Sequence, residues 1–311
     1  MLKQLTVLDA RHVWHGPMIE TACRRGYDAL RVLLGTSAYG REGLGFIRPH
    51  AHPKVLRANH DDDRVMREIG LTMVQDRAQV EVYDNKSAQF ERWGSLMPYT
   101  RRFENRSEAL EFINQWDGWL VSKADVGASS NNVRILRTRQ EQEHHVGQLF
   151  GTGLRVTHSA GGGGDRDVES RQHGYALLQE YIPHNCTWRV NKIGRKFAIF
   201  KRFNHPKRGT AQTGNVEPVK ELTAETSDLL CYADKVCDTI GTKWVALDVL
   251  KQGDAWRLIE TSLAWPWPSP GDCDNAPFFY FAHDWWPSEK SYQWRDMWDL
   301  MLDEYEAGIW N

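Results

Sequence analysis

The sequence lacks the features that mark membrane proteins and disulfide-rich secreted proteins. No stretch approaches the roughly 18 consecutive apolar residues of a transmembrane helix. The five cysteines are an odd number and form no C-x-x-C pair. A chain of 311 residues is also large enough to fold around apolar cores without disulfides. The first ten residues hold one basic side chain and a short apolar run, which is not the pattern of a signal peptide. We therefore predict a cytoplasmic protein with no membrane partner.

An excess of charge of one sign is also missing. Lys and Arg number 39 against 41 Asp and Glu, so the formal charge is -2 and creates no overall field that would draw the chain onto a polyanion. Any site for phosphate groups must be local. The sequence has no G-x-x-x-x-G-K-[ST] motif, which excludes a Walker P-loop.

A zinc site is not indicated either. His50 and His52 form an H-x-H, and His144 and His145 are adjacent. No Cys or acidic partner stands at zinc-binding spacing from either pair.

What the sequence does contain is a regular alternation of apolar runs and helical patterns, beginning with a strand, a helix and a strand. This order predicts a parallel α/β unit in an N-terminal domain of residues 1–76. Its expected elements are a strand at 5–8, a helix at 18–26, a strand at 29–34, a loop at 35–53, a helix at 62–69 and a strand at 71–74.

Residues 77–311 carry further strands and helices. We expect helices ending near 92 and at 107–116, 137–149, 223–240 and 288–305, and strands at 97–103, 118–123, 175–182, 187–193, 196–203, 243–250 and 256–263. The helix at 223–240 has the firmest pattern, with Thr223 as N-cap and Gly241 as its end. Gly161–Gly164 and the charged residues after them indicate an excursion between elements, and residues 161–171 are hypothesised to form a mobile cover.

The last predicted helix carries a wide apolar stripe. It consists of Trp294, Met297, Trp298, Met301, Leu302 and Tyr305. The stripe either docks on the protein's own core or forms the surface of a homodimer.

Two acidic residues, Asp248 and Glu260, lie on two apolar strands around the turn at 252–254. A hairpin centred on Asp254 places them opposite one another, with side chains about 5 Å apart. Facing carboxylates repel unless a positive charge lies between them, and Mg²⁺ suits that position. Ser262 projects from the same face as a third oxygen donor. The alternative is a solvated strand face.

Two lysines are candidates for binding phosphate. Lys86 lies near a helix start, and Lys123 closes an apolar strand, where an ordinary surface position is the alternative for each. Lys123 leads into the small-residue loop 124–133, whose backbone N–H groups can approach phosphate oxygens closely.

Eight short segments between residues 84 and 266 resemble, in their order, the ATP-grasp superfamily. They are Asp-Asn-Lys at 84–86, Pro-Tyr-Thr at 98–100, Leu-Val-Ser-Lys at 120–123, Leu-Gln-Glu-Tyr-Ile at 178–182, Trp-Arg-Val at 188–190, Lys-Arg at 201–202, Ala-Leu-Asp-Val-Leu at 246–250 and Leu-Ile-Glu-Thr-Ser at 258–262. The sequence is most similar to the ligases that add amino acids to carboxylates. Synapsin-like and inositol-phosphate-kinase-like members share the same ATP site.

The resemblance implies an α/β fold with α+β lobes: an ATP-grasp domain at 77–311 behind the N-terminal parallel α/β domain. Within it, the small lobe spans about 97–180, the hinge 179–182 and the larger lobe 183–311, which includes the aromatic C-terminal helix.

The resemblance also implies the roles of individual residues. Lys86 and Lys123 contact the ATP phosphates, while Gln179, Glu180, Tyr181 and Ile182 clasp adenine, with Glu180 on the adenine or ribose. Arg189 and Arg202 face the reacting groups, and Lys201 replaces Arg202 if the register is off by one. Asp248 and Glu260 hold one or two Mg²⁺ with Ser262, where the family usually has Asn.

The implied activity is an ATP-dependent carboxylate-amine ligase that acts through an acyl phosphate. Its substrates are a small carboxylate and an amine such as an amino acid, and a nucleotide or nucleic acid acceptor stays open. The alternatives are a kinase that phosphorylates a hydroxyl group and a non-catalytic ATP-binding module.

Overall fold

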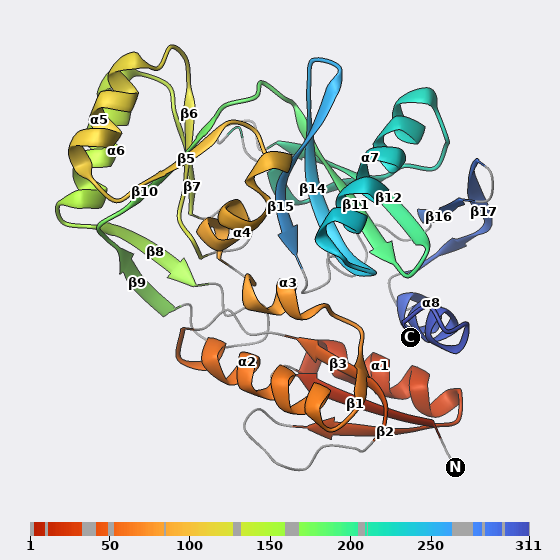
Figure 1. Ribbon diagram of the computed structural model, residues 1–311. Helices are drawn as coiled ribbons and strands as arrows, with labels where there is room; N and C mark the ends of the chain where they lie inside the picture. The colour runs from red at the N-terminus through yellow and green to blue at the C-terminus, as the bar shows by residue number, and fades with distance from the viewer. Residues whose placement is uncertain are drawn as a thin grey trace.

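The computed structural model describes residues 3–9, 12–32, 42–48, 53–83, 85–126, 132–158, 168–204, 209, 211–262, 276–281, 284–293 and 296–310. It is a mixed α/β structure with three parts, which confirms the predicted fold class (Figure 1). The N-terminal part lies at the bottom of Figure 1, the small lobe at the upper left and the large lobe on the right.

The N-terminal part is built on a four-stranded parallel sheet in the order β2-β1-β3-β4. Its elements are β1 (Lys3–Asp9), α1 (His12–Arg24), β2 (Tyr27–Val32), β3 (Gly43–Arg48), α2 (Pro53–Glu68) and β4 (Leu71–Met73). The predicted parallel unit is therefore confirmed.

Strand β3 corrects the loop expected at 35–53. Leu44, Phe46 and Ile47 are buried in this strand, whose glycines gave it the appearance of a loop. Gly45 is required by packing, because a Cβ there would lie 2.3 Å from the Met73 sulfur. Residues 33–41 and 49–52, which include His50 and His52, lie outside the described part of the chain.

Two short helices connect this part to the rest of the chain. They are α3 (Arg77–Glu81) and α4 (Lys86–Trp93), which is followed by the 3-10 turn η1 (Gly94–Leu96). The single helix expected to end near 92 is thus interrupted. Asn85 begins a new helix by accepting a hydrogen bond from the Ala88 N–H, so that Lys86 becomes the first residue of α4.

The small lobe is an antiparallel sheet in the order β5-β10-β6-β7, with α5 and α6 lying side by side against it (Figure 1). Its elements are β5 (Thr100–Phe103), α5 (Arg106–Gln115), β6 (Leu120–Lys123), β7 (Val133–Leu136), α6 (Arg139–Phe150) and β10 (Ala176–Glu180). These elements share a core of their own, around Phe103, Ile113 and Leu178.

Strand β7 is not among the predicted elements, because the predicted small-residue loop ends at 133 and nothing is predicted between it and the helix at 137–149. The predicted excursion also contains a two-stranded ribbon, β8 (Leu154–His158) and β9 (Val168–Gln172). Residues 168–171 of the expected mobile cover therefore form a strand. Residues 159–167, including Gly161–Gly164, lie outside the described residues.

The large lobe contains a seven-stranded sheet in the order β15-β14-β11-β12-β16-β17, with β13 also paired to β12. Its elements are β11 (Cys186–Ile193), β12 (Lys196–Asn204), β13 (Ala211–Pro218), α7 (Ala224–Ile240), β14 (Trp244–Gln252), β15 (Ala255–Ser262), β16 (Ala276–Phe281), β17 (Trp285–Tyr292) and α8 (Asp296–Glu306). Helix α7 packs on the sheet, with the predicted Thr223 cap and a left-handed Gly241 at φ 77°.

The last helix is shorter than predicted, since 285–292 form β17 and α8 begins at Asp296. Its residues Met297, Trp298, Met301 and Leu302 are buried within the chain. This confirms docking on the protein's own core and corrects the alternative of a dimer surface formed by these four residues. Trp294 lies outside the described residues.

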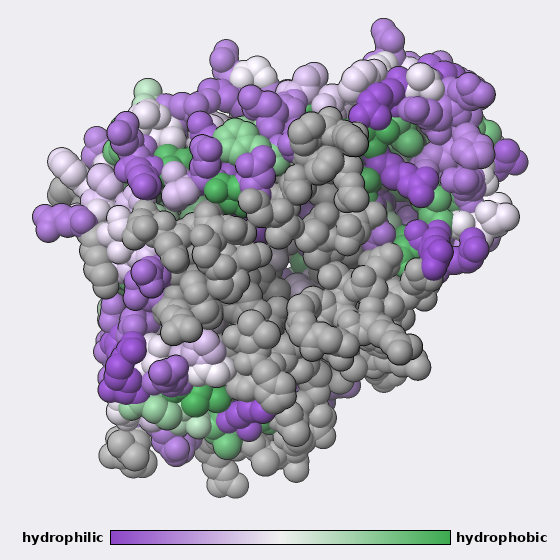
Figure 2. All heavy atoms as spheres, turned by 180° about the vertical axis from the view of Figure 1, so that it is seen from behind, coloured by the Kyte–Doolittle hydropathy of each residue, from purple (hydrophilic) through white to green (hydrophobic). Residues whose placement is uncertain are grey.

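One core joins the N-terminal sheet, α8 and the large-lobe sheet. Phe46 packs edge-on against Trp244 and Trp298, with ring centroids 5.6 and 5.5 Å away, and the two tryptophans stack on each other. The rear surface is mostly hydrophilic along its upper rim, with hydrophobic residues in small patches (Figure 2). No helix of the described residues is long and apolar enough to cross a membrane.

Candidate functional site

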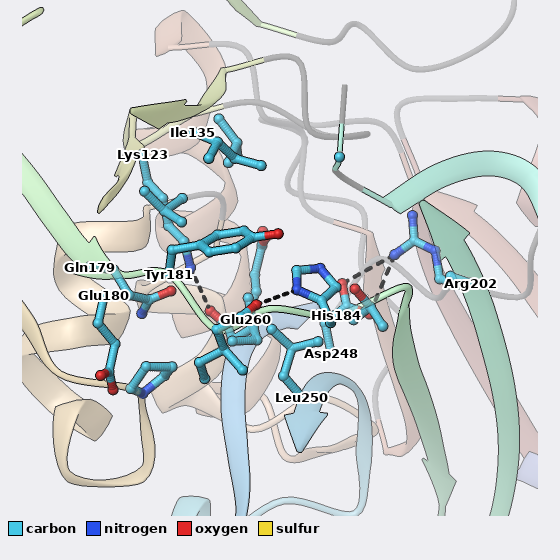
Figure 3. A pocket seen from close by; sticks show the side chains of 17 residues that line it. Lys123, Ile135, Gln179, Glu180, Tyr181, His184, Arg202, Asp248, Leu250 and Glu260 are labelled. Carbon is cyan, nitrogen blue, oxygen red and sulfur yellow. Dashed lines mark hydrogen bonds and ion pairs between the residues drawn. The ribbon is translucent and has the colours of Figure 1, made fainter. Parts of the chain in front are cut away.

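A pocket opens between the small-lobe sheet and the large-lobe sheet (Figure 3). Its apolar walls come from both lobes: Val121, Val133 and Ile135 on one side, and Leu250 and Ile259 on the other. The segment 179–182 connects the lobes along the pocket. The arrangement provides two apolar faces for a flat group and a polar end where the charged side chains gather.

The β14–β15 hairpin supplies the acidic end of the pocket. Asp248 pairs with Glu260, as predicted, but the geometric reason differs from the symmetric hairpin centred on Asp254. Gln252 pairs with Ala255 across a two-residue turn, and a regular ladder from that turn would place Asp248 opposite Ile259. Ile259 is instead the extra residue of a β-bulge, which shifts the register by one and brings Glu260 opposite Asp248.

The bulge also explains two further contacts of Ile259. Both Ile259 and its neighbour Glu260 line the pocket, although consecutive residues of a regular strand face opposite sides. The Ile259 carbonyl accepts a hydrogen bond from the Lys123 Nζ, 3.2 Å away. The bulge at Ile259 therefore has three effects. It adds an apolar side chain to the pocket wall, it turns the Glu260 carboxylate toward the pocket, and it places the carbonyl that binds Lys123.

Lys123 is buried, with 6% of its surface exposed, at the end of β6. Burial, with a smaller contribution from the nearby Lys86, lowers the pKa of Lys123 to about 8, although Glu260 and Asp248 act in the opposite direction. An ordinary surface position is thus excluded for this residue. Figure 3 shows its amino group pointing into the pocket toward the large lobe.

Lys86 is equally buried and reaches the same acid from another direction. Its Nζ lies 3.5 Å from Glu260 Oε1. Helix α4 is held against the large lobe by Gln89, whose side chain bonds both the N–H and the carbonyl of Thr261. Lys86 is therefore fixed beside the hairpin by the packing of α4.

Asp248 is neutralised by two arginines. Arg189 bonds both its carboxylate oxygens at 2.8 and 2.7 Å, and Arg202 Nη1 lies 3.3 and 3.2 Å from the same oxygens. Burial would raise the pKa of Asp248, but the two guanidinium groups outweigh it and lower the pKa to about 2. Arg189, Arg202 and Lys86 thus relieve the repulsion between the facing acids, which was the reason for predicting a metal ion between them.

The register of β12 decides between Arg202 and Lys201. Arg202 lines the pocket, while the Lys201 Nζ lies 4.5 Å from the centre of the Trp188 ring, on the opposite face of the sheet. The one-residue shift that would bring Lys201 to the site is therefore not observed, and the catalytic role of Arg202 stays a prediction.

The segment 179–182 lies where the hinge was predicted. Gln179 is buried and donates its side-chain N–H to the Thr100 hydroxyl. Glu180 Oε1 accepts from the Tyr99 N–H and from the Gln252 side chain at 2.8 and 3.0 Å. Glu180 thus links the small lobe to the β14–β15 turn. Tyr181 and Ile182 line the pocket, and contact of all four residues with a base stays a prediction.

Several pocket residues were missed by the sequence analysis. His184 and Thr187 line the pocket just after the hinge, and His184 Nδ1 lies 2.6 Å from the Ile182 carbonyl oxygen. Burial lowers the pKa of His184. The alternation of Val121 with Lys123 could have indicated one apolar wall, because residues two apart on a strand share a face.

The residues present fit a magnesium-bound polyphosphate. Lys86, Lys123, Arg189 and Arg202 surround only two carboxylates, which leaves an excess of positive charge suited to an anion. The candidate metal ligands offer oxygen only, which suits Mg²⁺. Among the described residues no cluster of three or more His, Cys, Asp or Glu could hold a metal, so the rest of the coordination shell would come from phosphate, water or Ser262.

Comparisons with known proteins identify the fold. No protein-family model matches the chain, and no curated sequence matches it. Solved structures do. A RimK-domain ATP-grasp protein from Sphaerobacter thermophilus is 18% identical with a TM-score of 0.60, and the match covers 86% of this chain and 93% of that one. D-alanine–D-alanine ligase from Bacillus anthracis is 11% identical with a TM-score of 0.58, covering 99% and 98%.

A third structure is that of the ATP-grasp ligase PsnB complexed with a minimal precursor, Mg and ADP. It is 14% identical with a TM-score of 0.57, and the match covers 88% of this chain and 93% of PsnB. The chain has the ATP-grasp fold. Two of these three matching structures are those of proteins named as ligases.

Proposed function

We propose that the protein is an ATP-dependent ligase that joins a carboxylate to an amine. The observation that carries this proposal is the convergence of Lys86, Lys123, Arg189 and Arg202 on the facing acids Asp248 and Glu260, at the end of an apolar pocket between two lobes. The structural likeness of most of the chain to the ATP-grasp ligase PsnB and to D-alanine–D-alanine ligase supports it.

The nucleotide would occupy the pocket with its base between the two apolar walls. Val121 and Ile135 would cover one face of the base and Leu250 and Ile259 the other, with the edge of the base along residues 179–182. His184 and Thr187 lie where they can contact the sugar. Glu180 Oε1 accepts from Tyr99 and Gln252, so this carboxylate would hold the hinge in place beside the adenine or ribose that it is predicted to bind.

The phosphates would lie at the charged end, between Lys86 and Lys123. Bound Mg²⁺ supplies positive charge to the phosphate oxygens, and Asp248 and Glu260, with Ser262, are the residues that would hold it. An ion at Asp248 would have to share that carboxylate with Arg189 and Arg202 or displace them. Arg202 lines the pocket and is therefore placed to contact the reacting phosphoryl group.

The reaction requires alignment and charge, and no protein nucleophile. An oxygen of the substrate carboxylate attacks the γ-phosphorus of ATP, the bond to the β-γ bridging oxygen breaks, and ADP leaves. The amine then attacks the acyl phosphate carbon, phosphate departs, and the amine loses a proton as the amide forms. Lys86, Lys123 and Arg202 would stabilise the negative charge that develops during the transfer.

The substrates are proposed by class. Among proteins of similar structure, one is a D-alanine–D-alanine ligase, and PsnB and the macrocyclase MdnC have each been solved with a bound precursor peptide. We propose an amino acid or peptide as one partner in the reaction. A small-molecule acid and a nucleotide acceptor are further candidates for the screen.

The first prediction tests the activity. ADP release should depend on an added carboxylate, and hydroxylamine should trap the acyl phosphate as a hydroxamate. Asp248→Asn and Glu260→Gln should lower both signals by roughly 100-fold, because the facing carboxylates would be lost from the charged end. The measurement is a coupled ADP assay with colorimetric hydroxamate detection across amino acids and peptides.

The matched control is Asp254→Asn, an exposed acid at the tip of the same hairpin, which should leave the rates unchanged. ADP release without hydroxamate, together with phosphate appearing on a hydroxyl, would identify a kinase instead. Nucleotide binding with no turnover for any substrate would favour a non-catalytic module.

A further inference from the structure

Asp125 connects the two elements that carry the phosphate-binding lysines. It lies two residues after Lys123, just beyond the end of β6. Its carbonyl oxygen accepts a hydrogen bond from the Lys86 N–H at 3.1 Å, and its Oδ1 accepts from the Ser87 N–H at 2.9 Å. Its other carboxylate oxygen accepts a hydrogen bond from the hydroxyl of Tyr175, the residue directly before β10.

These bonds complete the N-terminus of α4. The first N–H groups of a helix have no partner within the helix and must find one elsewhere. In α4 the third group, on Ala88, is capped by Asn85, while the first and second, on Lys86 and Ser87, are capped by Asp125 from the small lobe. A carboxylate is also the favoured charge at this end of a helix.

The cap is notable because α4 does not belong to the small lobe. Gln89 fastens α4 to Thr261 in the large lobe, and Lys86 contacts Glu260 there. Lys123 comes from the small-lobe sheet and reaches Ile259 in the large lobe. Asp125 is therefore the residue through which the main chain at Lys86 is tied to the strand of Lys123.

We propose that Asp125 is a positioning residue that sets the distance between Lys86 and Lys123, with Tyr175 holding its carboxylate in place. The inference rests on the proposed ATP site. It assigns selectivity for the phosphate chain to a residue that touches neither ATP nor substrate: Asp125 determines whether both lysines can contact the same polyphosphate.

The ribbon β8–β9 also contacts Asp125, through a hydrogen bond. The Asp125 N–H donates to the side-chain oxygen of Gln172, the last residue of β9, at 3.0 Å. Gln172 is itself buried. The base of the ribbon therefore meets the cap of α4, and the whole arrangement centres on one residue with partners in three segments.

A purely structural role predicts a different outcome. If Asp125 only stabilises the small lobe, its substitution should weaken the binding of every nucleotide and nucleoside to the same extent. The reason is that the small lobe also provides Val121 and Ile135 of the apolar wall. If it positions Lys86, only ligands with a phosphate chain should be affected. Comparing adenosine, AMP, ADP and ATP on the full chain separates the two.

The second prediction follows from this difference. In calorimetric titrations with Mg²⁺ present, Asp125→Ala should raise the dissociation constants for ATP and ADP by about tenfold. This is the loss expected when the charge-assisted hydrogen bond from the Ser87 N–H to the Asp125 carboxylate is removed. The dissociation constant for adenosine should stay within about twofold of the wild type. Asp125→Asn keeps an oxygen that can accept from the Ser87 N–H, so its loss of ATP affinity should be smaller. Tyr175→Phe removes only the hydroxyl that holds the carboxylate and should also lose less ATP affinity than Asp125→Ala.

The control is Asp117→Ala, an exposed acid on the other side of β6, which should change none of the four constants. Equal losses for adenosine and ATP, or unchanged ATP binding in Asp125→Ala, would overturn the inference. If the wild type itself binds ATP no better than adenosine, the proposed ATP site has failed instead, so the two failures are distinguishable.

Discussion

At the scale of single residues, Lys123 combines burial with the proposed role of binding phosphate, which needs a positive charge. Its amino group is fixed by the Ile259 carbonyl and faces Glu260, but burial still lowers its pKa to about 8. The folded-state pKa is below the unfolded value, so this group makes folding less favourable below about pH 8, and the penalty is relieved as pH rises toward the unfolded pKa. Below about pH 8 the fold therefore bears the cost of a buried, poorly solvated cation.

The third prediction uses this property. At pH 8, binding of ATP should be accompanied by uptake of up to about half a proton, because phosphate raises the pKa of Lys123. ATP affinity should fall as pH rises above 8. The measurement is calorimetry in buffers of different ionisation enthalpy.

In the Lys123→Arg variant the uptake should disappear, since arginine stays charged throughout this range. Uptake that persists in Lys123→Arg would show that another group titrates.

Asp248 behaves in the opposite way to Lys123. Its lowered pKa of about 2 means that its pairing with Arg189 and Arg202 stabilises the fold above the pKa of an unfolded aspartate and is lost as pH falls through about 2. The sequence identified Asp248 and Glu260 as a facing pair, because apolar strands around a short turn make two acids conspicuous. It could not show that arginines on the adjoining strands already neutralise Asp248, since that pairing depends on strand order.

At the scale of elements, the β14–β15 hairpin depends on its bulge. The fourth prediction concerns deletion of Ile259. The deletion restores a regular ladder in which Glu260 still lies opposite Asp248, so the fold should survive. The carbonyl that holds Lys123 is lost, together with the Ile259 part of the apolar wall that it shares with Leu250, and ATP affinity should drop by about tenfold or more.

Ile259→Ala provides the comparison, because it keeps the bulge and its carbonyl and removes only the side chain. Its loss of affinity should be clearly smaller, as measured by titration with ATP and by thermal unfolding. A deletion variant that binds ATP as well as Ile259→Ala would contradict the role given to the bulge.

Helix α7, whose apolar pattern is regular, was predicted well, and several polar strands were not predicted. Helix α7 has Leu229, Leu230, Ala233 and Val236 at helical spacing and was found with both ends correct. Strands β9 (Val168–Gln172) and β13 (Ala211–Pro218) are largely polar and form through pairing with a neighbouring strand, which a local pattern does not reveal.

At the scale of the whole molecule, the cores do not follow the lobes. The N-terminal sheet, α8 and the face of the large-lobe sheet around Trp244 share one core, whereas the small lobe has its own. The boundary proposed near residue 76 therefore separates stretches of sequence that pack together. The three segments of the site, around residues 86, 123 and 248–260, lie far apart in the sequence and meet through the contacts of α4 and β6 with β15, which explains why each lysine alone resembled a surface residue.

The fifth prediction tests this arrangement. Phe46→Ala, a change in the N-terminal sheet, should destabilise the shared core by about 3 kcal/mol. It should speed hydrogen exchange in β14 and α8 while leaving α5 nearly unchanged, because Phe46 packs on Trp244 and Trp298. The readout is native-state exchange monitored by mass spectrometry.

The converse variant is Ile113→Ala in the buried core of the small lobe, which should speed exchange in α5 and spare β14. Uniform acceleration in both variants would show that the whole chain unfolds as a single unit.

The extra residue in β15 has a consequence for recognising distant relatives. Asp248 and Glu260 are twelve positions apart here, but a chain with the same turn and no bulge would hold the same two acids eleven positions apart. An alignment that forbids a gap inside a strand would match the acid of one such chain to the isoleucine of the other and score the site as absent. Homology searches for this hairpin should therefore permit a one-residue indel within the strand as well as at the turn.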